Sequence, residues 1–160
     1  MIMKRLLLIL LCLPMIGFGQ QTGCISGDCE NGYGTYVWEN GSKYKGEWRN
    51  GEMHGLGTLT WTTGGVYKGE WKDGVRFGAG AYYYADGNIY IGGWNDNKRH
   101  FWGGIKYESN GNIRFGMYNS GVLNGAGWLV GKGGTNQIEM WDRGEMDAWF
   151  DAKYIDWNEK

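Results

Sequence analysis

The sequence contains little proline and little cysteine, and its charges nearly cancel. One proline in 160 residues excludes proline-rich linkers, and collagen would also need glycine at every third position. Three cysteines are too few for a dense disulfide framework. Seventeen acidic and 16 basic residues give a net charge of −1. The chain therefore lacks the excess of positive charge that proteins use to bind nucleic acid.

Glycine and aromatic residues are abundant instead. The chain has 31 glycines, 10 tryptophans, 11 tyrosines and 5 phenylalanines. A disordered chain would be poor in aromatic residues. A helical bundle would not carry glycine throughout, because each interior glycine costs about 1 kcal/mol relative to alanine. The composition predicts short strands, tight turns, and rings packed against bare backbone.

The N-terminus has the order of segments found in secretory signal peptides. Lys4 and Arg5 precede a mostly apolar run over residues 6–18, and the small residue Gly19 follows. The run is shorter than the roughly 20 residues that cross a membrane as a helix. We expect residues 1–19 to be a signal peptide and the protein to reach the periplasm, the cell surface or the medium. An uncleaved anchor is the alternative, and a lipid anchor on Cys24 is less favoured because Gln21-Thr22-Gly23 lacks the expected aliphatic residue.

Two cysteines remain after this cleavage. Cys24 and Cys29 are five residues apart, and an oxidising compartment favours a disulfide between them. Free thiols are the alternative, and a metal site would need further ligands nearby. Loss of Lys4 and Arg5 leaves 14 basic against 17 acidic residues, a net charge of −3.

A repeat of 23 or 24 residues runs through the remaining chain. Its units start at residues 44, 67, 90, 114 and 137, after a partial unit over residues 27–43. The fifth position of each unit is always aromatic: Trp48, Trp71, Trp94, Tyr118 and Trp141. We expect these five side chains to form a structural ladder, because stacked repeats bury one continuous face.

Each unit has the pattern of a β-hairpin. In the first unit, Tyr44 and Trp48 alternate with Lys45 and charged neighbours, which is the two-residue period of a strand. Asn50-Gly51 follows, and such pairs favour two-residue hairpin turns. The expected fold is all-β: an elongated, curved, single-layer antiparallel sheet of stacked hairpins.

The repeated pattern Tyr-x-Gly-x-Trp-x-x-Gly-x-x-x-Gly-x-Gly resembles the MORN repeat family. The resemblance is close in the units from Tyr44 and Tyr67, and weaker toward Gln137. It implies a MORN repeat domain over residues 20–145 that acts as an interaction module. It implies no catalytic residue and no cofactor, so we expect the protein not to be an enzyme.

Two sets of residues could suggest chemistry, and their spacing argues against it. His54 and His100 are two units apart, roughly 19 Å along a sheet, so they cannot share a metal ion. Glu47 and Glu70 have a spacing of roughly 10 Å, near that of an inverting glycosidase pair. Lysines and arginines surround them, however, and solvated ion pairs are the better interpretation. No catalytic or metal-binding residue is predicted.

The tail, residues 146–160, departs from the repeat. Its aromatic residues recur at a spacing of three to four, which predicts a short amphipathic helix that caps the last edge of the sheet. A partner-binding helix is the alternative.

The face opposite the ladder changes character along the repeat. It carries Lys45 and Glu47 in the first unit, but apolar residues in the third and fourth. We predict a binding surface formed by Tyr83, Ile91, Trp102, Phe115 and Met117, with Trp128 and Val130 on the same face. The tail could instead fold back and cover these residues.

The sequence thus indicates an exported binding or scaffold module. A protein partner or self-association is favoured. A glycan or a membrane lipid head group is the alternative, and nucleic acid is excluded by the charge.

Overall fold

The computed structural model describes residues 21–107, 109–133 and 136–151. The predicted signal peptide lies outside these residues. The described chain forms twelve strands and no helix. The strands are β1 (Gly23–Gly27), β2 (Tyr33–Val37), β3 (Lys43–Arg49), β4 (Glu52–Thr60), β5 (Val66–Lys72), β6 (Val75–Tyr83), β7 (Ile89–Asn95), β8 (Lys98–Lys106), β9 (Ile113–Asn119), β10 (Val122–Val130), β11 (Asn136–Asp142) and β12 (Glu145–Asp151).

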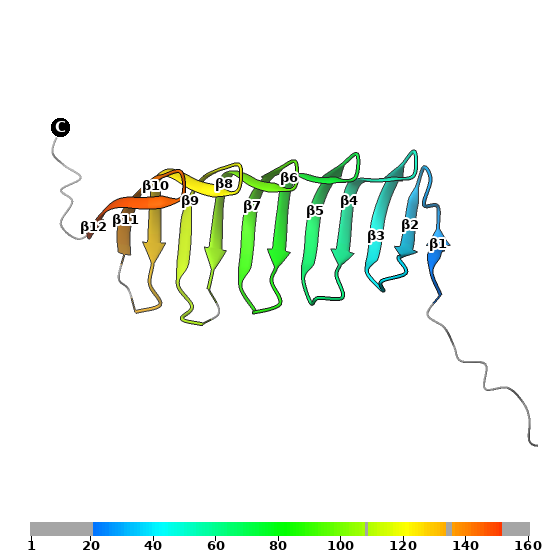
Figure 1. Ribbon diagram of the computed structural model, residues 1–160, viewed down its shortest axis with the longest axis horizontal. Coiled ribbons are helices and arrows are strands. Elements are labelled where there is room, and N and C mark those ends of the chain that lie inside the picture. The colour runs from blue at the N-terminus through cyan, green and yellow to red at the C-terminus, as the bar shows by residue number, and fades with distance from the viewer. Residues whose placement is uncertain (1–20, 108, 134–135, 152–160) are drawn as a thin grey trace, which may run out of the picture.

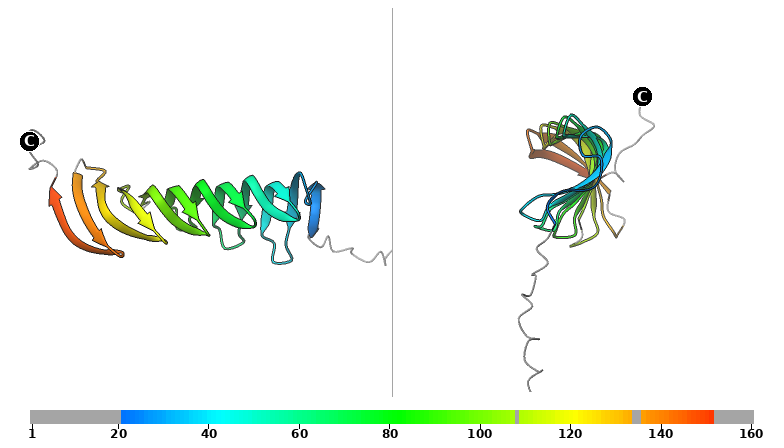
Figure 2. Two further views of the ribbon diagram at one scale, coloured as in Figure 1. Left: turned by 90° about the horizontal axis from the view of Figure 1, so that it is seen from above. Right: turned by 90° about the vertical axis from the view of Figure 1, so that its right-hand side faces the viewer.

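All twelve strands belong to one open antiparallel sheet. Their order in the sheet is their order in the chain, so every strand pairs with its sequence neighbours, as Figure 1 shows. The end-on view in Figure 2 shows that the strands curve across the width of the sheet. The predicted single-layer sheet of stacked hairpins is therefore confirmed.

The hairpin turns follow from local residue preferences. Asn50 and Gly51 join β3 to β4 with φ angles of 50° and 74°, the left-handed region that this tight turn requires. The backbone N–H of Gly51 also donates to the carbonyl of Glu30 in the preceding hairpin at 3.0 Å. Equivalent bonds join later turns to their preceding hairpins, so each turn also holds two units together.

The core lies on one face of the sheet, which we call the ring face. Tyr44, Tyr67 and Tyr90 alternate there with the tryptophans of the ladder. Each tyrosine contacts one ladder ring of its own hairpin and one of the next, edge to face, with centroids 5.0 to 5.5 Å apart. This geometry is favourable for aromatic pairs. Trp48, Trp71, Trp94 and Tyr118 are buried and Trp141 is half-buried.

Glycines under the rings allow this close packing. A Cβ atom at Gly57 would collide with the ring of Tyr44. The indole Nε1–H of Trp71, from the next hairpin, donates to the carbonyl of the same Gly57 at 3.3 Å. Trp48 and Trp94 make the equivalent bond to earlier glycines. One glycine therefore accommodates a ring from its own unit and binds a ring from the next.

The two ends of the sheet differ from each other. A disulfide joins Cys24 in β1 to Cys29 in the following turn, as the cysteine spacing predicts. At the other end, the predicted C-terminal helix is wrong for residues 146–151, which form most of β12. These residues pair with β11, including Ala148 with Met140, because the open edge of β11 offers backbone partners that a helix would leave unused. Residues 152–160 of the predicted cap lie outside the described residues.

Removal of one ladder ring tests this description of the core. We expect Trp71→Ala to lower the free energy of unfolding by about 3–5 kcal/mol, as large core truncations do. The variant loses ring contacts in two hairpins and the bond to Gly57. Chemical denaturation followed by tryptophan fluorescence measures the change. An unfolding midpoint equal to that of the wild type would show that the ring face is not the core.

Candidate functional site

The face opposite the rings, which we call the outer face, carries charged side chains on β3 and β5, while β4 and β6 add the exposed apolar side chains of Leu56 and Tyr83. Lys45 and Glu47 in β3 and Lys68 and Glu70 in β5 lie on it. The carboxylate of Glu47 accepts the backbone N–H of Leu56 at 2.9 Å, and Glu70 makes the equivalent bond to Ala79. Among the described ion pairs neither carboxylate appears. Each carboxylate therefore accepts a backbone N–H group where the strand register shifts. The sequence alone predicts solvated ion pairs at these positions instead.

Over β7 to β11 the same outer face is apolar. The cross-strand register aligns Ile91 with Gly104, Gly104 with Phe115, and Phe115 with Trp128. A second row beside it aligns Trp102 with Met117. We define the apolar patch as the exposed residues of these rows and their neighbours: Ile91, Phe101, Trp102, Phe115, Met117, Trp128 and Met140.

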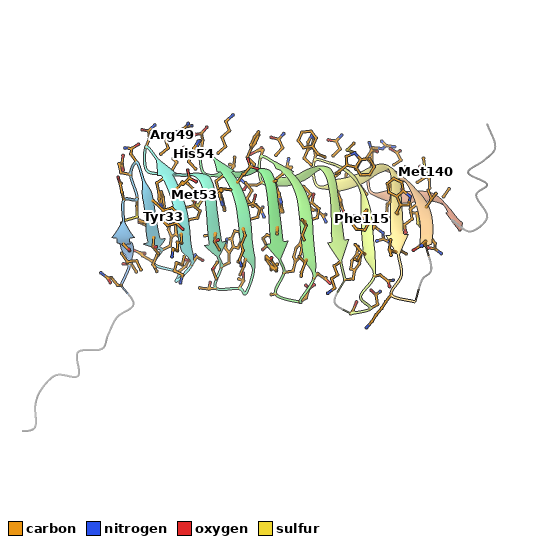
Figure 3. The ribbon with its side chains drawn as sticks, turned by 180° about the vertical axis from the view of Figure 1, so that it is seen from behind. Tyr33, Arg49, Met53, His54, Phe115 and Met140 are labelled. Carbon is orange, nitrogen blue, oxygen red and sulfur yellow. A yellow bond between two sulfur atoms is a disulfide. The ribbon has the colours of Figure 1, made fainter. Side chains whose placement is uncertain are left out.

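Most of the predicted binding residues come together in this patch. Ile91 is 64% exposed, Trp102 52% and Phe115 42%, and Met117 lies across from Trp102. Phe115 and Met140 lie toward the β12 end of the sheet in Figure 3. Tyr83 is the exception. It lies in β6 at the border of the charged region, where the ammonium group of Lys68 sits 5.4 Å from the centre of its ring.

The rings of the patch lie low over the sheet. A Cβ atom at Gly104 would collide with the ring of Phe115, so the absence of a side chain there lets this ring cover β8. The rings of Trp102 and Trp128 are 5.7 Å apart and inclined by 30°. Phe115 therefore covers the backbone of β8, and Trp102 and Trp128 lie side by side.

Phe101 belongs to the patch, and sequence reasoning did not select it. It occupies the position that Gly55, Gly78 and Gly125 hold in other units, where φ is positive in every case. Phe101 keeps this conformation, with φ of 61°, although a bulky side chain is strained there. It is 58% exposed.

The residue that faces Phe101 on the neighbouring strand also differs from its equivalents in the other units. In the first unit, Glu47 lies over Gly55. In the third unit the position of Glu47 is held by Gly93, and the ring of Phe101 lies over Gly93. The large and the small residue have exchanged strands. A comparison of both positions along the repeat would have revealed this exchange from the sequence.

The two histidines have a structural role. His54 Nδ1 accepts the backbone N–H of Asp73 at 3.4 Å, and His100 Nδ1 accepts that of Ser120 at the same distance. Asn31 and Asn124 make equivalent bonds through their side-chain oxygens. This repeat position therefore supplies an acceptor for the turn of the next hairpin. Among the described residues, no three His, Cys, Asp or Glu side chains are close enough to hold a metal ion.

The fourth and fifth units contain a buried ion pair. Arg114 replaces the leading tyrosine of the earlier units, and its guanidinium binds the carboxylate of Glu139 at 2.8 and 3.2 Å. Glu139 is 2% exposed and also accepts the indole N–H of Trp141. Beside Arg114 on the ring face, burial raises the pKa of Tyr118 to about 12, and among the described groups its hydroxyl has no hydrogen-bond partner. This polar cluster belongs to the core, where it replaces a tyrosine and a glycine.

Comparison with known proteins agrees with the repeat structure. The model of the MORN repeat family matches residues 30–43, 44–66, 67–89 and 90–100. Comparison with curated proteins finds no match. In the part of the chain that the structure describes, no helix is long and apolar enough to span a membrane. Of the apolar patch, Ile91 lies within the matched segments and the other six residues follow them.

The strain at Phe101 can be measured. We expect Phe101→Gly to raise the free energy of unfolding by about 1 kcal/mol, because glycine adopts a positive φ without strain. Thermal and urea unfolding of the isolated variant measure the change. Gly78→Phe is the matched control at the equivalent position, and we expect it to be destabilised. A loss of stability in Phe101→Gly would show that the ring of Phe101 is needed for the fold.

Proposed function

We propose that this chain, which belongs to the MORN repeat family, acts by binding rather than by catalysis, and that its apolar patch is the docking surface. The partner is a protein or a second copy of the chain. The single observation behind the proposal is that the lysine and glutamate positions of the outer face on β3 and β5 give way to a contiguous group of exposed apolar side chains over β7 to β11. A regular repeat does not need this change for stability, since the rings on the other face form the core. Contiguous exposed apolar surfaces of this kind mark interaction sites.

The composition of the patch favours a protein partner. It combines aromatic side chains with methionine, and both are enriched at protein interfaces. The inclined pair Trp102 and Trp128 is the observation that favours the alternative partner, a glycan, because sugars stack on exposed rings. The aliphatic members Ile91 and Met117 favour a protein. An anionic lipid is disfavoured, because the patch contains no lysine or arginine and the predicted mature chain has a net charge of −3.

The proposal includes export. It rests on the basic, apolar and small residues that follow one another over residues 1–19, and it places the protein in the periplasm, on the cell surface or in the medium. The disulfide between Cys24 and Cys29 is in keeping with such a compartment, because disulfides persist where the surroundings are oxidising.

Export is tested by mass. The protein isolated from the exported fraction should have the intact mass of a chain that begins at Gln20 with one disulfide, because the peptidase removes residues 1–19. Reduction should add about two mass units, one hydrogen per sulfur. A full-length mass in that fraction, or recovery from the cytoplasm alone, would contradict the proposal.

The docking surface is tested by charge substitution. We expect the double variant Trp102→Glu with Phe115→Glu to keep its melting temperature within a few degrees, because both side chains are exposed. The same variant should lose the partner that the wild type retains after cross-linking in the exported fraction. The measurements are thermal unfolding and mass spectrometry of the cross-linked products.

The control variant carries the same substitutions elsewhere on the outer face. Tyr33→Glu with Leu56→Glu changes two side chains that are 58% and 62% exposed, in β2 and β4, away from the patch. It should keep both the fold and the partner. Equal cross-linking in the patch variant and the control would rule out the patch as the docking surface.

A further inference from the structure

From β7 to β11 the sheet is apolar on both faces. The rings and their neighbours cover one face, and the apolar patch covers the other. Strands with two apolar faces are typical of sheets that are covered on both sides. In the part of the chain that the structure describes, all strands lie in one layer, so no described segment covers the outer face of these strands.

We infer that the second layer is another copy of this chain, packed patch to patch across a two-fold axis. The inference rests on the proposed function, because it names the partner of the same surface. Two sheets packed in this way lie about 10 Å apart, with side chains of both inner faces in contact. An isologous interface uses the same residues on each copy.

The size of the patch agrees with this arrangement. Its seven side chains are 37% to 64% exposed. Each leaves on the order of 100 Å² accessible, given the 150–250 Å² of an aromatic side chain, so the patch offers about 700 Å². The largest apolar patch of a typical monomer is about 300–600 Å², whereas each side of a stable interface buries roughly 600–1,000 Å². The patch is therefore large for a monomer and sufficient for a dimer.

The charge distribution permits the contact of two identical surfaces. A two-fold axis brings every charged residue near the axis close to its own copy, and like charges at such a distance repel. The two rows of the patch contain no charged side chain. Lys68 and Glu70 lie on β5, away from these rows. Lys106 in β8 is exposed on the same face, but it lies in the neighbouring row, opposite Ile89 and Ile113, at the margin of the patch.

The conformation of Phe101 points the same way. Glycine occupies this position in three other units with the same positive φ, so the fold does not require a ring here. The chain nevertheless places an exposed ring there, beside Trp102 in the patch, at the expense of backbone strain. The ring covers Gly93 but remains 58% exposed, and a face-to-face copy would bury the exposed part.

The experiment is sedimentation equilibrium of the purified protein, as the cell produces it, over a hundredfold range of concentration. We expect the wild type to form a dimer. Trp102→Glu with Phe115→Glu should weaken the dimer by at least about 100-fold, since it places charges in the centre of the interface. Tyr33→Glu with Leu56→Glu should dimerise like the wild type.

Phe101→Gly is the decisive variant. We expect its dimer dissociation constant to rise at least about tenfold, while the folded monomer is at least as stable as that of the wild type. A structural role for Phe101 would instead lower the stability of the monomer. If the glutamate variant fails to fold, Phe101→Gly decides alone: an unchanged dissociation constant overturns the inference, and a raised one supports it.

The outcomes separate this inference from the proposed function. A wild type that stays monomeric at every concentration overturns the second copy, and residues 152–160 or a foreign partner would then cover the patch. Suppose that the wild type is monomeric, and that Trp102→Glu with Phe115→Glu folds but loses a cross-linked partner. The patch is then a docking surface for another protein, as proposed, and does not mediate self-association. A dimer that the patch variants leave intact overturns the inference, because the contact must then lie elsewhere.

Discussion

The contact between rings of successive hairpins is the interaction on which the rest of the structure depends. A hairpin alone cannot bury enough apolar surface to be stable in water. Tyr67 overcomes this limit by contacting Trp71 in its own hairpin and Trp94 in the next, over glycines that leave room for both. Stability is therefore a sum over neighbouring units. Because one face provides all of this cohesion, the outer face is free to vary without loss of the fold.

Departures from the repeat occur in pairs that touch in space. Gly93 and Phe101 exchange a large and a small residue across two strands. Arg114 replaces a tyrosine and meets Glu139 one unit later. Phe77 holds the position at which His54 and His100 accept a backbone N–H from the next turn, and its side chain cannot accept one. In that turn, the side chain of Asn97 instead accepts the backbone N–H of Arg76. In the exchanges of Gly93 with Phe101 and of Arg114 with Glu139, both partners of one contact differ from the repeat and the contact is kept in altered form.

Two of these exchanges, Gly93 with Phe101 and Arg114 with Glu139, lie in the same half of the sheet as the apolar patch. The residues of β3 to β6 follow the repeat closely, and there the outer face carries lysines and glutamates on β3 and β5, and the glutamate carboxylates bind the backbone. The residues of β8 to β11 keep the ladder rings, with Arg114 and Glu139 in place of a tyrosine and a glycine on the same face, and do not keep the outer pattern. The first units thus keep a regular outer pattern, and the later units carry the apolar patch that we propose as the docking surface.

The sequence by itself determined the period, the hairpins and the ring face, because these depend on contacts between residues close in the chain. The two-residue period and turns such as Asn50-Gly51 are read within a single unit, and the ladder repeats them. The outcome at residues 146–151 depended on the tertiary structure, since their spacing allows a helix and only the open edge of β11 selects a strand. The membership of the patch was decided in the same way. The register pairs Phe101 with the ring-face residue Tyr118, yet Phe101 has a positive φ of 61° and its ring lies over Gly93 on the outer face. The two-residue period of a strand does not predict this placement.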